Sequence, residues 1–101
     1  MAKFTKKVEF NAYQFNAEEV KGMDDYDIED VIIEALTIPD GVKSAFVTDA
    51  GKLDVVLYTY DREKTKEWFE LNPGDWLTVN DFGEFIVITD EKFKEFATPA
   101  Q

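Results

Sequence analysis

The chain has 101 residues with 22 acidic and 11 basic side chains, a formal charge of −11, and neither cysteine nor histidine. A chain of this length fits one compact unit, so we expect residues 1–101 to form a single domain. The absence of cysteine and histidine excludes disulfide frameworks, thiolate zinc sites and the usual hydrolase triads. The negative net charge disfavours direct nucleic-acid binding.

The first predicted element is a strand over residues 8–15, where apolar and polar side chains alternate. Tyr13 and Phe15 break this alternation, which predicts a bulge or the end of the strand. Its predicted core face carries three residues: Val8, Phe10 and Ala12.

A short helix is predicted next, because Asn16 and Glu19 have the spacing of a capping box. It should run through Ala17 and Val20 and end near Gly22.

The principal helix is predicted over residues 28–36, with Asp27 as its N-cap. Pro39 and Gly41 stop it from continuing. Its apolar residues recur at i, i+3, i+4, i+7 and i+8 and form one stripe: Ile28, Val31, Ile32, Ala35 and Leu36.

Alternating apolar residues after the helix predict a series of strands. A turn at 49–52 joins the first two into a hairpin, and the second is apolar on both faces, which favours a central position. The segment 72–75 is a turn in which Gly74 takes a positive φ and Asp75 accepts from a backbone amide. The predicted strands cover residues 44–48, 53–60, 68–71, 76–79 and 85–88.

A last hairpin turns at 80–83, and Thr89 or Asp90 caps a short C-terminal helix that buries Phe93 and Phe96. The fold class is therefore α+β: a mainly antiparallel sheet of about five strands, one principal helix packed on a face, and the short C-terminal helix. Ten residues are predicted to form the core: Val31, Ile32, Leu36, Phe46, Val55, Leu57, Leu77, Ile86, Val87 and Phe93.

Negative charge is concentrated between Glu18 and Asp40, where nine acidic residues face one lysine and give −8 of the chain's −11. A calcium loop fails here because Asp30 and Leu36 occupy positions that require glycine and glutamate. A solvated solubility face and a partner-binding surface both fit this charge. The candidate binding residues are Asp24, Asp25, Asp27, Glu29, Asp30 and Glu34.

The segment 72–77, the return Gly83-Glu84-Phe85 and the closing Phe93 resemble a group of small phage and prophage proteins. In that group a Pro-Gly-Asp-Trp/Tyr turn precedes a short strand and a Gly-Glu-aromatic segment. The opening strand, residues 8–15, is also similar, whereas the middle of the chain is not matched. The resemblance implies a phage-borne origin and an α+β fold, and it carries over no ligand or catalytic residue.

These observations favour a non-catalytic accessory protein that binds a host or phage protein with a basic surface. One alternative is an acidic DNA mimic that inhibits a nucleic-acid-binding defence or regulatory protein. The other is a small-molecule-binding protein whose aromatic pocket holds Tyr58, Trp68 and Trp76. We expect no enzyme activity, metal, cofactor or membrane contact, a cytoplasmic location (that of the host cell if phage-encoded), and a monomer or small homo-oligomer.

Overall fold

The computed structural model describes residues 10–58, 65–80 and 83–96, and it confirms the α+β class. The elements in chain order are β1 (Phe10–Gln14), α1 (Ala17–Val20), α2 (Asp25–Leu36), β2 (Val42–Val47), β3 (Leu53–Tyr58), β4 (Lys66–Leu71), β5 (Trp76–Asn80), β6 (Phe85–Ile88) and α3 (Asp90–Phe96). Some sequence predictions concern positions outside the described residues: Val8, Tyr60, Asp81, Phe82 and the side chain of Phe96.

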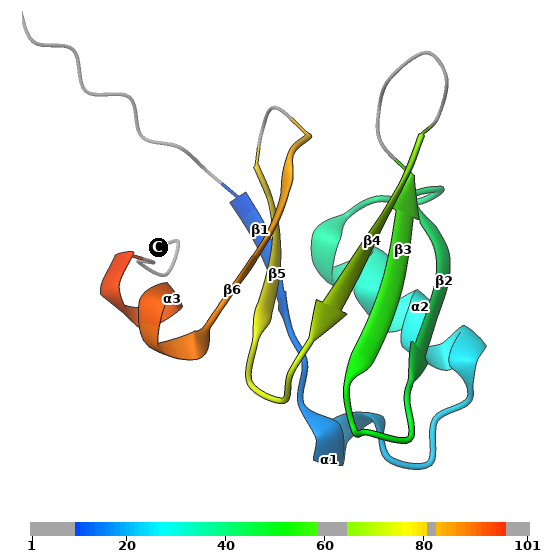
Figure 1. The fold of residues 1–101 in the computed structure, drawn as a ribbon. Coiled ribbons are helices and arrows are strands. Elements are labelled where there is room, and N and C mark those ends of the chain that lie inside the picture. Colours follow the sequence, from blue (N-terminus) through cyan, green and yellow to red (C-terminus); the bar gives the residue numbers. More distant parts are fainter. Residues whose placement is uncertain (1–9, 59–64, 81–82, 97–101) are drawn as a thin grey trace, which may run out of the picture.

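The described strands form two antiparallel three-stranded sheets, β1-β5-β6 and β2-β3-β4, so the predicted single sheet of about five strands was wrong (Figure 1). The turn at 72–75 explains the difference. Its Gly74 amide donates to the Phe15 carbonyl at 2.8 Å, and the Phe15 amide donates to the Asp75 carbonyl at 2.9 Å. These bonds attach the turn to the end of β1, so the chain leaves one sheet after β4 and enters the other as β5.

Strand β1 buries the face opposite to the predicted one. Tyr13 and Phe15 are 5% and 0% exposed, whereas Phe10 packs edge-on against the Phe93 ring of α3. The ladder to β5 is regular along the whole strand, so there is no bulge; the strand ends at Gln14, which is the other alternative that the sequence left open. The alternation of apolar residues predicted the wrong core face because both faces of β1 are covered, one by the main core and the other by α3.

Helix α1 is present as predicted, since the Asn16 side chain accepts from the amides of Glu18 and Glu19. Helix α2 begins at Asp25, three residues before the predicted start. Asp24 is its N-cap instead of Asp27, because the Asp24 carboxylate accepts from the Asp27 amide at 2.8 Å.

The apolar stripe of α2 packs on the core as predicted. Figure 1 shows α2 behind the β2-β3-β4 sheet, and α3 beside the other sheet. Thr37, with a left-handed φ of 56°, ends the helix, and the amides of Thr37 and Ile38 both donate to the Ile33 carbonyl. The buried members of the stripe are Ile28, Ile32 and Leu36, with Val31 and Ala35 partly buried beside them.

The hairpin of β2 and β3 and the strand β4 confirm the sequence prediction. Gly51 turns the hairpin at φ 79°, and β3 is the central strand of its sheet. Burial alternates strictly along β3, so one side faces the core and the other does not. The core-facing residues of β3 are Leu53, Val55 and Leu57.

One cluster of buried side chains joins both sheets, α1 and α2. Two of the ten predicted core residues were wrong: Phe46 is 41% exposed and Ile86 is 51% exposed. Phe46 pairs with Asp54 on the side of β3 away from the core, and Ile86 lies on the edge strand β6. Of the other eight predicted core residues, three are partly buried: Val31, Val87 and Phe93. The remaining five are fully buried: Ile32, Leu36, Val55, Leu57 and Leu77.

Truncating Leu57, which is 0% exposed, to Ala should destabilise the fold by about 2–5 kcal/mol, because it leaves a cavity in the shared core. The neighbouring Val56→Ala, on the opposite side of β3, should cost about 1 kcal/mol or less. Urea unfolding of both variants checks this. Equal losses would show that the two sides of β3 are not distinguished by burial.

Candidate functional site

Helix α2 holds the acidic residues in a fixed orientation. Its buried stripe packs against β1 and β2, so the remaining side of the helix faces solvent. The helix end is also fixed, because the Asn11 side-chain amide donates to the Leu36 carbonyl at 3.2 Å. Side chains that point outward from α2 therefore project from a rigid support.

We call the six candidate binding residues the acidic face: Asp24, Asp25, Asp27, Glu29, Asp30 and Glu34. Five of them are exposed and Glu29 is half-buried. Folding accounts for the three at the start of the helix. Asp24 is the N-cap, and Asp25 and Asp27 lie in the first turn, where negative charge favours the helix dipole.

Asp30 and Glu34 have no such structural duty. Neither has an ion pair or side-chain hydrogen bond with any of the described residues. Glu34 lies in the last turn of α2, which has no basic residue and where a negative charge opposes the helix dipole. Together with Asp27 they recur at i, i+3 and i+7, so the three carboxylates line one outward side of the helix.

Tyr26 adds an aromatic ring to this surface that the sequence reasoning missed. It is 77% exposed in the first turn of α2, among the carboxylates. The sequence held the signal, because Tyr26 falls outside the apolar stripe that begins at Ile28 and therefore has no place in the core. Tyrosine at such a position combines apolar area with a hydroxyl, a common feature of binding surfaces.

The three residues of the predicted aromatic pocket do not share one site. Tyr58 and Trp68 lie on β3 and β4, where Trp68 pairs with Val56 and is a diagonal neighbour of Tyr58. Trp76 lies on β5, in the other sheet. Tyr58 and Trp68 are thus neighbours on the side of β2-β3-β4 away from the core, without Trp76.

Trp76 instead anchors helix α3. Its indole stacks on the Phe93 ring at 3.8 Å between centroids, and its Nε1 donates to Asp90 Oδ1 at 2.9 Å. The Trp76 bond lowers the pKa of the Asp90 carboxyl, and a hydrogen bond from Lys94 lowers it further. Gln14 also donates to Asp90 Oδ1, at 3.3 Å. The tryptophan of the turn motif is therefore explained by folding.

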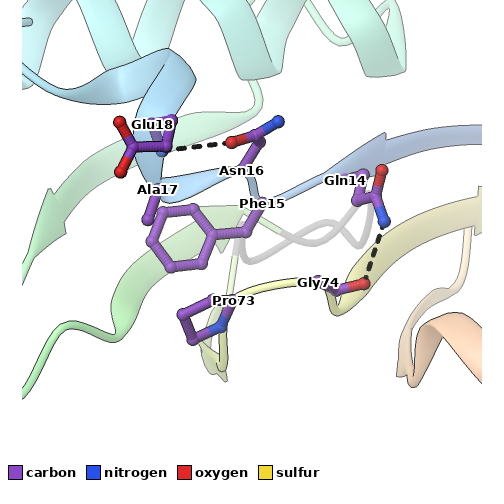
Figure 2. A pocket seen from close by; sticks show the side chains of 7 residues that line it. All are labelled: Gln14, Phe15, Asn16, Ala17, Glu18, Pro73 and Gly74. Carbon is purple, nitrogen blue, oxygen red and sulfur yellow. Dashed lines mark hydrogen bonds between the residues drawn. The ribbon is translucent and has the colours of Figure 1, made fainter.

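A shallow depression of about 350 Å³ lies where α1 meets the turn at 72–75 (Figure 2). Its polar groups are already used, since Gln14 donates to the Gly74 carbonyl at 3.2 Å and Asn16 accepts from the Glu18 amide. The depression therefore marks the junction between the end of β1 and the turn. The lining residues are Gln14, Phe15, Asn16, Ala17, Glu18, Pro73 and Gly74.

Within the described ranges, no three side chains that could ligate a metal come together. No helix in that part of the chain is long and apolar enough to cross a bilayer. Comparison with protein-family models found no match, and no curated protein or solved structure is significantly similar to the chain.

Replacing Asp90 by Asn should lower the melting temperature at neutral pH, because it weakens the bonds that hold α3. A carboxyl whose pKa is lowered by folding stabilises the native state above its unfolded pKa of about 3.9 and loses that effect as the pH falls further. The difference between the native protein and Asp90→Asn should therefore shrink below about pH 3.9.

Thermal melts followed by circular dichroism over a pH series measure this difference. Glu91→Gln, at an exposed position in the same helical turn, is the control and should show a much smaller effect at neutral pH. An Asp90→Asn difference that stays constant into strong acid would contradict the role assigned to the carboxylate.

Proposed function

We propose that this protein is a non-catalytic accessory protein, of the kind that phages and prophages carry, and that it binds a host or phage protein through the acidic face. The observation that carries the proposal is the outward row of Asp27, Asp30 and Glu34 beside exposed Tyr26 on a rigidly packed helix. Asp30 and Glu34 are the informative members, because capping does not explain them.

The chemistry of this surface favours a partner with a basic surface. Concentrated carboxylates attract a surface rich in lysine and arginine and accelerate the encounter with it. Once docked, the carboxylates can accept charge-assisted hydrogen bonds, and Tyr26 supplies an aromatic contact near them. The partner is therefore a protein with a basic surface, and neither a nucleic acid nor a membrane.

The phage assignment rests on the resemblance of the turn at 72–77 and the Gly83-Glu84-Phe85 return. In this fold Gly74 has φ 94°, Asp75 accepts from the Asn72 amide, and Trp76 anchors α3. These are folding roles. The segment that resembles the phage group thus supports the fold, which leaves binding to the unmatched middle of the chain.

A DNA mimic is a narrower version of the same proposal. The specific observation in its favour is the alignment of Asp27, Asp30 and Glu34, which spans about 10 Å at 1.5 Å per residue, so the charges follow one line as backbone phosphates do. In that case duplex DNA would compete for the partner. If DNA does not displace the partner, the DNA-mimic hypothesis is excluded and the broader proposal is unaffected.

The test is charge reversal of Asp30 and Glu34 to Lys in one variant. Both positions are exposed, so the free energy of unfolding should change by about 0.5 kcal/mol or less, and lysine in place of Glu34 favours the helix dipole. Immobilised native protein should retain a partner from host lysate at low salt and release it as salt rises, whereas the variant should fail to retain it.

The matched control reverses Asp49 and Glu67, two exposed acidic residues outside α2, and changes the net charge by the same amount. It should retain the partner as the native protein does. If the Asp30/Glu34 variant retains the same partner with the same salt response, the acidic face contributes only to solubility and the proposal is wrong.

A further inference from the structure

The β2-β3-β4 sheet has α2 on one side and no described element on the other. We call this second side the open sheet face. Residues directly opposite each other in an antiparallel ladder share a face, so the pairing defines its members. They are Lys43, Ser44 and Phe46 from β2, Asp54, Val56 and Tyr58 from β3, and Lys66, Trp68 and Glu70 from β4.

The centre of the open sheet face is apolar. Trp68 of β4 is 64% exposed and Phe46 of β2 is 41% exposed, and the strand between them, β3, contributes half-buried Val56 and Tyr58. Trp68 pairs with Val56 across the ladder. Trp68 lies halfway along the edge strand β4, and a large exposed aromatic on a sheet face is typical of an interface, because such side chains contribute most when a second surface excludes water from them.

Charge is divided between the two ends of this face. A register shift in β2 places Lys43 at the same end as Tyr58 and Lys66. The ammonium groups of Lys43 and Lys66 lie close together, and this proximity lowers the pKa of Lys43. The opposite end carries Asp54 and Glu70, which pair directly across the ladder.

The acidic end also contains an unsatisfied acceptor. Asp54 Oδ1 is inaccessible to solvent and has no hydrogen-bond donor in the described structure. Glu70 is paired with Lys52 at 3.2 Å, but both side chains remain about two-fifths exposed. The open sheet face therefore carries an exposed carboxylate, Glu70, at one end and two lysines without an acidic partner among the described residues at the other.

These charges are self-complementary under a two-fold rotation. An axis that lies in the interface and runs across the strands places Lys66 over Glu70 and Tyr58 over Asp54 of a second copy. It also brings the two Trp68 side chains together near the axis. An axis along the strands would instead place lysine over lysine. Two-fold interfaces require such self-complementary surfaces.

The strong net charge does not oppose this arrangement. Most of it lies between residues 18 and 40, and α2 packs on the other side of the sheet. Packing the open sheet faces together, with layers about 10 Å apart, keeps the two acidic faces outermost, well beyond the Debye length of about 8 Å at physiological salt. The open sheet face itself carries three lysines, counting Lys52, against two carboxylates.

We propose that the open sheet face is the two-fold interface of a homodimer of this chain, with Trp68 of the edge strand β4 beside the two-fold axis. Three strands of six residues cover about 20 Å by 14 Å, or about 280 Å² on each copy, which is less than a stable specific interface buries, so the dimer is a weak one that forms only at high concentration. Its consequence is bivalency, because the dimer displays two acidic faces on opposite sides to a partner that presents repeated basic sites.

Sedimentation velocity on the protein alone, at physiological salt and from about 1 μM to about 1 mM, tests the proposal. The mass should rise from that of a monomer to that of a dimer. Trp68→Ala should raise the dissociation constant at least about tenfold. Tyr26→Ala, which removes an even more exposed aromatic from α2, should leave the dissociation constant unchanged within about twofold.

Charge reversal tests the orientation of the axis. Lys66→Glu alone and Glu70→Lys alone should each weaken the dimer, because like charges then meet across the axis. An equimolar mixture of the two variants should associate as a heterodimer, in which opposite charges meet again. Circular dichroism melts confirm that each variant is folded.

A native protein that stays monomeric up to about 1 mM, or a dimer that Trp68→Ala leaves intact, would overturn the proposal. So would a mixture of the charge variants that associates no better than either one alone. No partner protein enters these measurements, so their outcome is independent of whether the acidic face binds one.

Discussion

The arrangement of this protein depends on two backbone hydrogen bonds between Phe15 and the turn at 72–75. The Gly74 amide donates to the Phe15 carbonyl, and the Phe15 amide donates to the Asp75 carbonyl. A β-turn with Gly74 at positive φ can present these groups to another strand, which a chain continuing as a simple hairpin would not do. The bonds transfer the chain from the β2-β3-β4 sheet to the β1-β5-β6 sheet and hold the two sheets against one core.

The division into two sheets determines which surfaces are left for binding. Helix α2 closes the core and turns its carboxylates outward, while α3, held by Trp76 and Asp90, covers the second side of β1. No described element covers the second side of β2-β3-β4. The acidic face and the open sheet face thus lie on opposite sides of the same sheet, and each can be occupied without blocking the other.

Local patterns predicted the elements well because local interactions determine them. The stripe of α2, the Asn16 cap, the Gly51 hairpin and the positive φ of Gly74 all depend on residues close in sequence. Pairing was not predictable in the same way. The contact of β1 with β5 joins residues more than sixty positions apart, and periodicity carries no information about which strands become neighbours.

The same limit explains the errors at single positions. Phe10 and Phe46 have the spacing of core residues, but α3 covers one and nothing described covers the other. For the candidate site, the sequence located the negative charge, while only the structure separated capping residues from Asp30 and Glu34 and placed Trp76 away from Tyr58 and Trp68. Burial depends on what packs above a face, which a strand's own pattern does not encode.

If the outward side of α2 contacts a partner protein, amide chemical-shift mapping will locate that contact on the helix. The captured partner would be titrated into ¹⁵N-labelled protein. We expect the largest shifts at Tyr26, Asp27, Asp30 and Glu34, with the amides of α3 unchanged. Shifts confined to α3 or to the β1-β5-β6 sheet, with α2 unaffected, would contradict it.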